Sequence, residues 1–356
     1  MARFAEPHPL CAHGGLDPTE LARLGLSPDQ VLDLSVNVNP FGPHPEVVRA
    51  VRDAALDRYP DRHDGRARAA LARALDYDPA RVVLGHGSVE LLWSLIGLLP
   101  RERPLLVVGP TFGEPEAAAR AHGVPVRTLT MPEAAGFALD PRAIDHAITR
   151  QHASAVYLCQ PNNPTGRALQ AGALQALTDA HPDCLFLLDQ AFLSLSTLHA
   201  QAELRFGDHV VLVRSLTKDH ALAGLRVGYA LAAPDLLRQL VARRPPWMIS
   251  APAQAAVEAA IGQPGHVAHA RERLLAERAR LSAAIHRLGF EVVPGETHFL
   301  LVRVGDAEGL RARWLTRERI LIRSGQSFGL PDHIRLAAID EATSARVLAA
   351  FSRDAP

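Results

Sequence analysis

The stretch VVLVRSLTKDHALAGLRVGYALAA, residues 210–233, contains Lys218, the single lysine among 38 Lys and Arg residues in this chain of 356. Richness in Arg, Ala, Leu and Pro is typical of a GC-rich genome and explains why lysine is rare, but it does not explain the exception. A guanidinium replaces an ammonium in ion pairs and phosphate binding, yet it stays protonated and is no amine nucleophile. Lys218 is therefore a candidate for imine chemistry, with chance retention as the alternative.

Seven short apolar runs surround Lys218 and alternate with helical patterns between residues 45 and 235. Most are uninterrupted, as expected of strands buried on both faces of a largely parallel sheet. We predict an α/β fold with a three-layer α/β/α large domain, in which the last strand is antiparallel to its predecessor. The predicted strands are 81–87, 104–110, 124–130, 154–160, 184–190, 209–215 and 227–233, and helical spacing marks 45–56, 88–99, 114–123 and 168–181.

From residue 264 the pattern changes. A long amphipathic helix opens at Pro264, and short apolar runs and one further helical segment follow it. This pattern predicts a smaller α+β domain. We expect three parts: an N-terminal segment, 1–44, that joins the small domain; a large domain, 45–263; and the small domain, 264–356.

Composition narrows the range of partners. The chain has 38 acidic residues against 38 Lys plus Arg, so no global field favours nucleic acid or an anionic membrane. No apolar run approaches the roughly 20 residues of a membrane span, and the start has no apolar signal core. The odd set Cys11, Cys159 and Cys184 favours a reducing cytoplasm over a disulfide framework. The scattered histidines predict no metal site.

Polar groups follow the predicted strands at the edge where ligands collect in parallel sheets. Gly87, Ser88 and Val89 follow the first strand and open a helix, so their N–H groups are placed to bind phosphate. Such a turn is common in α/β proteins and is weak evidence alone. Asn163 lies in the turn 161–166 after the fourth strand.

Asp189 ends the apolar run CLFLLD, where a carboxylate is costly unless it is paired; a helix cap would also explain it. Lys218 lies one strand–helix–strand unit further on. Ser215 and Arg226 flank it, and both residue types suit a phosphate.

Together these residue types match the requirements of one cofactor, pyridoxal phosphate. It needs an amine for its aldehyde, a carboxylate for its ring nitrogen, a donor for its phenolate oxygen, a phosphate cup and a flat side chain against its ring. The carboxylate keeps the ring nitrogen protonated, because an opposite charge favours the charged form. The residues that can fill these roles, in that order, are Lys218, Asp189, Asn163, the turn Gly87–Ser88–Val89 with Ser215 and Arg226, and Phe112.

The motifs SLTKDHALAGLRVGY, QPNNPTG, LLDQAF and GPTFGE resemble those of fold-type I pyridoxal phosphate enzymes in the class I/II aminotransferase family, over nearly the full chain. The resemblance implies that Lys218 links covalently to the cofactor and that Asn163 binds its ring hydroxyl. It implies that Tyr59 reaches the cofactor phosphate of a neighbouring subunit, hence a homodimer with shared active sites. It also suggests Arg335 as the binder of the substrate α-carboxylate.

Two branches of that family act on phosphorylated substrates. The chain is similar throughout to histidinol-phosphate aminotransferases, and in several places it looks nearer to the threonine-phosphate decarboxylases of cobalamin biosynthesis. The resemblance to the decarboxylases implies substrate contacts from an N-terminal HGG motif, from an NxN motif and from a pair of C-terminal arginines. It also rests on a phenylalanine where aminotransferases carry a tyrosine. These residues are His13 and Gly14, Asn37 with Asn39, Arg323 with Arg335, and Phe192.

Three residues depart from the decarboxylase pattern: Leu16, Gln190 and His298 stand where that branch has other residues. The first is expected to alter substrate contacts, and the second removes a charge near the ring. Whether the substrate loses its carboxylate or a proton depends on how the arginines place the carboxylate, a matter of about an ångström.

Two further protein classes are compatible with an α/β chain of this length: a non-catalytic regulator on the same fold and a nucleotide-binding protein. The full set of cofactor residues argues against the regulator. The segment GHGSVE after the first strand does not fit the glycine fingerprint that a nucleotide-binding protein would carry there.

Overall fold

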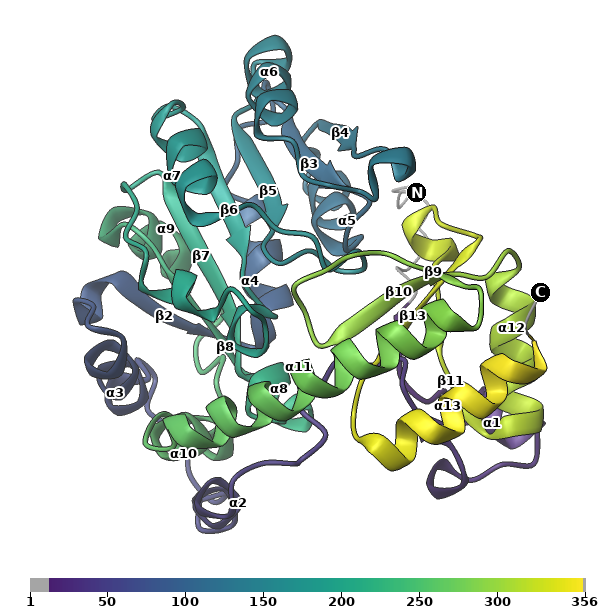
Figure 1. Cartoon of the computed structure of the whole chain (residues 1–356). Helices are drawn as coiled ribbons and strands as arrows, with labels where there is room; N and C mark the ends of the chain where they lie inside the picture. The colour runs from purple at the N-terminus through teal and green to yellow at the C-terminus, as the bar shows by residue number, and fades with distance from the viewer. Residues whose placement is uncertain (1–12, 355–356) are drawn as a thin grey trace, which may run out of the picture.

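The computed structural model describes residues 13–354. Its large domain is built on a seven-stranded sheet, and all seven predicted strands are confirmed (Figure 1). The strand β8 pairs antiparallel with both of its neighbours, β2 and β7, and the other neighbours pair parallel. The order across the sheet is β2 (Val82–Gly85), β8 (Gly228–Leu231), β7 (Val210–Ser215), β6 (Leu185–Asp189), β5 (Ala155–Cys159), β3 (Leu105–Gly109) and β4 (Val126–Thr130).

Helices cover both faces of this sheet and give it two apolar cores. Successive strand residues enter opposite cores: Leu84 belongs to one cluster and Val83 to the other. This alternation explains why the strands are apolar along their whole length. One face carries α2 (Pro45–Arg52), α3 (Gly65–Leu75), α6 (Pro141–Gln151), α7 (Ala171–Asp179) and α10 (Ala251–Ile261), and the other carries α4 (Gly87–Ile96), α5 (Glu114–Ala121) and α9 (Pro234–Ala242).

The small domain has an antiparallel sheet of its own. Leu300 and Ile334 from this sheet pack with Ile285 and Phe351 from the covering helices α11 (Pro264–Arg287) and α13 (Glu341–Arg353). A further helix, α12 (Ala307–Arg313), continues into a π-helical turn, Trp314–Glu318. The sheet order is β12 (Arg323–Ser324), β13 (His333–Ala337), β10 (Phe299–Arg303) and β9 (Glu291–Val292).

The N-terminal segment lies against the small domain. Its strand β1 (Leu32–Asp33) pairs in parallel with β11 (Ile320–Leu321). Leu21, in α1 (Pro18–Arg23), packs with Leu315 and Leu321. The segment then crosses to the large domain, where the Asn39 N–H donates to the Lys218 carbonyl oxygen at 2.8 Å.

The long helix α11 is shared between the two domains; in Figure 1 it runs below the large sheet and above α13. Val267 and Leu274, in its N-terminal half, pack with Leu195 of the 3-10 helix η4 (Leu193–Leu195). Leu281 and Ile285, in its C-terminal half, belong to the small-domain core. The helix therefore packs against both domains. Because it belongs to both, the division of the chain at residue 264 stays a proposal.

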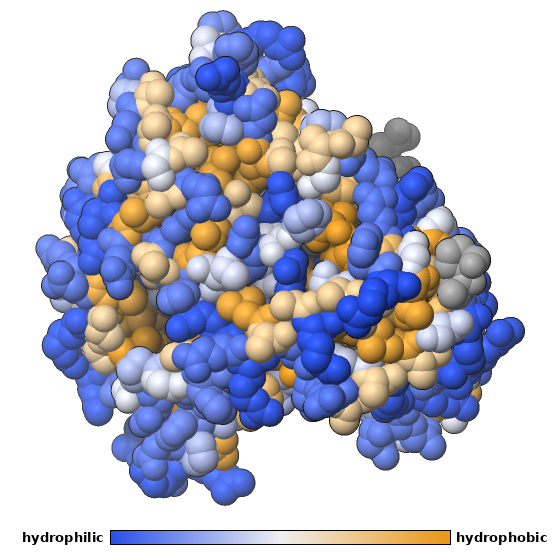
Figure 2. Space-filling view, viewed as in Figure 1, coloured by the Kyte–Doolittle hydropathy of each residue, from blue (hydrophilic) through white to orange (hydrophobic). Residues whose placement is uncertain are grey.

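The outer surface is mixed in polarity. On the face shown in Figure 2, hydrophobic residues form separate patches among hydrophilic ones. None of the helices within residues 13–354 combines the length and apolar character needed to cross a membrane. In the same residues, no group of three or more His, Cys, Asp and Glu side chains is arranged to hold a metal. Cys159 and Cys184 are free and buried, and Cys11 lies outside the described residues.

Candidate active site

A cavity of about 390 Å³ lies between the strand ends of the large sheet and the sheet of the small domain. Most of the predicted site residues line it, although they come from positions far apart in the chain. Gly87 and Ser215 lie beside it without lining it, and Tyr59 is elsewhere on the surface. The predicted residues in the lining are His13, Gly14, Asn37, Ser88, Val89, Phe112, Asn163, Asp189, Lys218, Arg226, Arg323 and Arg335.

One end of the cavity is formed by the start of α4. Gly87 has a φ of +78°, and a Cβ there would lie 2.8 Å from a terminal nitrogen of Arg226. Gly228 is equally constrained, because its Cβ would lie 2.8 Å from the Ser88 amide nitrogen. The two glycines thus let backbone N–H groups and a guanidinium converge, which is the arrangement of a phosphate cup.

Ser215 shapes this end indirectly. Its hydroxyl accepts a hydrogen bond from the Thr217 N–H at 3.3 Å and so caps α8 (Leu216–Asp219), and it lies 2.6 Å from the Thr217 hydroxyl. Thr217 itself lines the cavity, although the sequence did not lead us to predict it. A hydroxyl two residues after the predicted one, at the start of a short helix, was the available signal.

Asp189 ends β6 at the cavity floor and is 4% exposed. The Tyr157 hydroxyl donates to its Oδ2 at 2.9 Å, and the Ala191 N–H donates to its Oδ1 at 3.0 Å. Burial raises the pKa of Asp189, while these two hydrogen bonds and the charge of Lys218 oppose that rise. The carboxylate therefore has two neutral donors and space beside it for a positively charged ligand atom.

Lys218 lies in α8 and is partly buried in the cavity wall. Burial, together with the charges of Arg335 and Arg226, lowers the pKa of its amine to about 8, although Asp189 works in the opposite direction. Within the described residues, no hydrogen bond or ion pair reaches this amine. The amine is thus available as a nucleophile close to neutral pH.

Arg335 bridges the two domains at the back of the cavity. Its guanidinium donates to the Asn163 side-chain oxygen and to the Ser35 carbonyl oxygen. Because Arg335 occupies that oxygen, the Asn163 amide group remains as a donor for a ligand. Burial and the charge of Arg323 lower the pKa of Arg335 to about 9.

Arg323 stands beside Arg335 because the two residues are direct partners across β12 and β13. Its guanidinium lies over the Phe328 ring, 5.3 Å from the ring centroid, and donates to the Ser327 hydroxyl. Asn37, 2% exposed, has no partner for either side-chain amide atom among the described residues. The small domain and N-terminal segment thus present two cations and an unsatisfied amide to the cavity.

The N-terminal residues 13–17 form a strap whose first two residues, His13 and Gly14, line the cavity. His13 Nε2 lies 2.8 Å from Glu114 Oε1, and the Trp93 indole donates to the other Glu114 oxygen at 2.7 Å. A Cβ on Gly14 would lie 2.3 Å from the Ser35 carbonyl oxygen, so only glycine permits this approach. The strap is therefore held against the large domain at one end.

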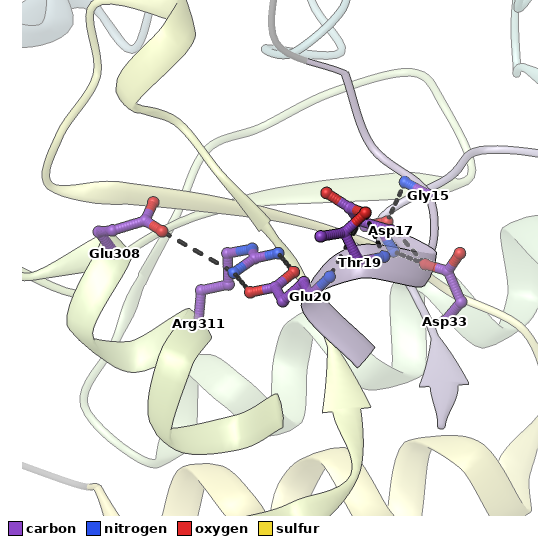
Figure 3. A network of polar contacts seen from close by, with 8 residues as sticks. Gly15, Asp17, Thr19, Glu20, Asp33, Glu308 and Arg311 are labelled. Atoms are coloured by element: carbon purple, nitrogen blue, oxygen red, sulfur yellow. Dashed lines mark hydrogen bonds and ion pairs between the residues drawn. The ribbon is translucent and has the colours of Figure 1, made fainter. Parts of the chain in front are cut away.

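The other end of the strap is held by the small domain, as Figure 3 shows. The Gly15 N–H donates to the Ser35 hydroxyl at 2.7 Å, and Asp17 caps α1. Glu20, on α1, accepts two hydrogen bonds from Arg311 of α12 at 2.8 and 2.6 Å. The strap and the helix α1 that follows it thus connect α12 in the small domain with α5 in the large one.

The residues that depart from the expected pattern occupy different surroundings. Leu16 packs with the small cluster around Leu21, and Gln190 accepts a hydrogen bond from Arg214 at 2.9 Å. His298 is fully buried and lies against Phe192, with a ring-centroid separation of 6.3 Å. Burial, followed by the charge of Arg335, lowers the pKa of His298 to about 4, so the ring is neutral.

Tyr59 is 79% exposed and stacks on Trp247, with ring centroids 4.7 Å apart. It does not approach the cavity of its own chain. Leu56, three residues before it, is exposed as well. Tyr59 could therefore contribute only to the active site of another copy of the chain.

The residues present fit pyridoxal phosphate. Asp189 is a buried carboxylate with no cation bonded to it, which suits a pyridinium nitrogen. The amide of Asn163 suits the phenolate oxygen, and the cup at Gly87 and Arg226 suits the phosphate. The amine of Lys218 suits the aldehyde.

Known proteins of one family match almost the whole chain. The family described as aminotransferase class I and II matches residues 29–351. The threonine-phosphate decarboxylase of Salmonella typhimurium is 34% identical over 96% of this chain and 95% of its own length. A histidinol-phosphate aminotransferase of Shouchella clausii is 31% identical over 88% of this chain and 86% of its own.

A solved structure is similar over almost the whole molecule. The histidinol-phosphate aminotransferase of Sinorhizobium meliloti in complex with pyridoxal-5'-phosphate has a TM-score of 0.85 and 25% identity, covering 99% of this chain and 98% of that one. Fold and cavity together define a pyridoxal phosphate enzyme, and pyridoxal 5'-phosphate is its cofactor. The chain belongs to the class I and II aminotransferase family.

Proposed function

We propose that this enzyme decarboxylates L-threonine O-3-phosphate, or a close analogue, to carbon dioxide and aminopropanol phosphate. The observation that supports this most is the pairing of Arg323 with Arg335 across β12 and β13, with His13 at the same cavity. A phosphorylated amino acid carries both a carboxylate and a phosphate, and these groups need separate cationic partners. The similarity to a threonine-phosphate decarboxylase over 96% of the chain supports the same assignment.

The chain's residues divide the work as follows. Asp189 would hold the ring nitrogen, Asn163 the phenolate oxygen, and the start of α4 with Arg226 the phosphate. Bound pyridoxal phosphate supplies an electron sink for the pair left on the substrate's α carbon when a bond there breaks. The Lys218 amine would hold the proton that this carbon receives.

The arginines decide which bond breaks. By fixing the direction of the substrate carboxylate, the arginines would favour its loss over loss of the α proton, and Lys218 would return a proton to the α carbon. We propose that Arg335 holds the carboxylate and Arg323 the phosphate. Phe192 lines the cavity but has no hydroxyl that could bond the phenolate oxygen. The side-chain amide of Asn163 would therefore be the donor to that oxygen.

A direct assay separates the candidate reactions. The holoenzyme is incubated with O-phospho-L-threonine, and separately with histidinol phosphate plus 2-oxoglutarate. Release of carbon dioxide from the first mixture is the expected result, and glutamate from the second would favour transamination instead. Arg323→Leu should raise KM for the phosphorylated substrate far more than KM for unphosphorylated threonine, and equal effects on both would contradict the phosphate role.

Amino transfer of the histidinol-phosphate type is the second candidate. It is supported by the aminotransferase of Shouchella clausii and by the Sinorhizobium meliloti structure. The paired arginines also suit 2-oxoglutarate, which has two carboxylates. Glutamate formation with no carbon dioxide release would identify this reaction.

We also propose that the enzyme is a homodimer with shared active sites. Tyr59, exposed and stacked on Trp247, would reach the cofactor phosphate of the partner subunit. An exposed aromatic pair is costly to leave in water and is typical of an interface. Sedimentation should therefore give twice the mass of one chain.

A further inference from the structure

We propose that Tyr157 is a positioning residue that holds the Asp189 carboxylate in place for the cofactor's ring nitrogen. The inference rests on the cofactor and not on the choice of substrate, since both candidate reactions need that ring nitrogen. Its basis is the hydrogen bond of 2.9 Å from the Tyr157 hydroxyl to Asp189 Oδ2. Tyr157 does not line the cavity and would act only through Asp189.

The surroundings of Tyr157 make this hydrogen bond unusual. The side chain is fully buried, in the middle of β5, and packs in an apolar cluster with Val107 and Leu187. A phenylalanine would fill that apolar space equally well, whereas a buried hydroxyl is costly without a partner. The hydroxyl finds its partner in Asp189, on the neighbouring strand β6.

The carboxylate needs the donor because it has few others. Oδ1 accepts from the Ala191 backbone N–H, and Oδ2 accepts from Tyr157. The sulfur of Cys159, two residues further along β5, is directed instead to the Pro161 carbonyl oxygen at 3.3 Å. Tyr157 is therefore the one side chain that donates a hydrogen bond to this carboxylate among the described residues.

The electrostatic consequence follows from burial. Burial favours the neutral form of Asp189, and a donor to the charged form works against it. Without the hydroxyl the carboxyl group would be protonated more readily, and it would rotate more freely because only the Ala191 N–H would still hold it. A neutral carboxyl group no longer stabilises positive charge on the ring nitrogen, so cofactor binding should weaken.

The test is the variant Tyr157→Phe, which removes one oxygen atom. Apoenzyme is prepared, and the dissociation constant for pyridoxal phosphate is measured together with the pH dependence of the bound cofactor's absorbance. We expect the dissociation constant to rise roughly 10-fold, which corresponds to the loss of one hydrogen bond to a charged group. We also expect a change in the pH at which the absorbance of the bound cofactor undergoes its transition. An unchanged dissociation constant and an unchanged transition would overturn the proposal.

A double-mutant cycle separates positioning from general damage. In an Asp189→Asn background, adding Tyr157→Phe should change pyridoxal phosphate binding by less than about 2-fold, because the charge on which Tyr157 acts is already absent. An equal loss in both backgrounds would mean that the hydroxyl acts independently of Asp189, and would refute the proposal.

A matched control is available in Tyr229, a second buried tyrosine of the same sheet, 7% exposed, that does not line the cavity. Tyr229→Phe should leave both the dissociation constant and the absorbance transition unchanged. An effect equal to that of Tyr157→Phe would mean that any loss of a buried hydroxyl from this sheet weakens cofactor binding, and it would overturn the proposal. Failure of the unsubstituted chain to bind pyridoxal phosphate would be a different result, since it would refute the cofactor itself.

Discussion

Lys218 combines the chain's only side-chain amine with surroundings that disfavour its charge. Burial, Arg335 and Arg226 lower its pKa to about 8 from an ordinary value of 10.5. The neutral amine is the form that attacks an aldehyde. Covalent capture of pyridoxal phosphate should therefore increase with pH and reach half its maximum near pH 8, measured as the mass gained by the chain after borohydride reduction.

The charges around Lys218 make that midpoint adjustable. Arg335→Leu removes one of the two nearby positive charges and should raise the midpoint, whereas Arg66→Leu, on an exposed helix face, should leave it in place. Lys218→Arg should abolish capture. A midpoint near the ordinary lysine value in the unsubstituted chain would contradict this account.

His298 should make stability depend on acidity. Its pKa is lowered to about 4 in the folded chain, against 6.5 ordinarily, so between these values the unfolded chain binds a proton that the folded chain does not. Stability should accordingly fall as the pH falls from about 6.5 to about 4, by up to roughly 3 kcal/mol. Urea midpoints measured at both ends of this range would show the loss.

The matched substitutions for this test are His298→Asn and His146→Asn. His298→Asn should flatten the acid decline, because it removes the titrating ring. His146 is exposed on α6, and its substitution should leave the decline unchanged. A decline that is the same in all three proteins would show that other groups cause it.

Residue types and strand ends were enough to predict Asp189, Asn163, Lys218 and the glycine turn as neighbours, because parallel strands place their ends at one edge. The residues that hold these side chains in place through hydrogen bonds were not predictable in the same way. Tyr157 meets Asp189 only through the pairing of β5 with β6, and Glu114 meets His13 across a sequence separation that no local pattern reveals.

Among the elements, apolar strands were easier to predict than peripheral helices. All seven strands of the large sheet and the helix at 264 were expected, since long apolar runs and a clear helical period identify them. The helices α3, α6, α9, α10 and α13 were not individually predicted. Two of these, α3 and α10, pack on each other and on the sheet through small alanine side chains, which give a weak periodic signal.

The strap at residues 13–17 gives a prediction at the scale of an element. Glu114 begins α5 and holds His13, which lines the cavity. Glu114→Gln weakens the hydrogen bond between residue 114 and His13. It should raise the substrate KM by roughly 10-fold with a smaller change in kcat, while the dissociation constant for pyridoxal phosphate stays the same. Steady-state kinetics with O-phospho-L-threonine would measure the split.

Glu116 offers the matched control for the strap. It lies on the same helix, is more exposed and pairs with Arg120 one turn away. Glu116→Gln should leave KM unchanged. An equal rise in KM for both variants, or a loss confined to kcat, would show that Glu114 supports α5 and does not orient His13.

At the scale of the whole molecule, the proposed sharing of active sites in a homodimer predicts complementation between inactive subunits. Lys218→Ala and Tyr59→Ala chains, mixed and allowed to exchange, should form heterodimers in which one of the two sites has both residues. Activity should recover to roughly a quarter of the unsubstituted level when half the dimers are mixed. No gain over the Tyr59→Ala homodimer alone would mean that each site is built from one chain.

The solitary lysine also changes how this protein can be handled chemically. Reagents that acylate lysine side chains, including fluorescent dyes, cross-linkers and immobilisation resins, usually modify many surface positions. Here the only such side chain lies in the cavity wall, and its amine is largely neutral above about pH 8. A small acylating dye would therefore label one side chain in the interior of the enzyme, and bound cofactor would protect it, so labelling yield at that position becomes a direct count of vacant sites.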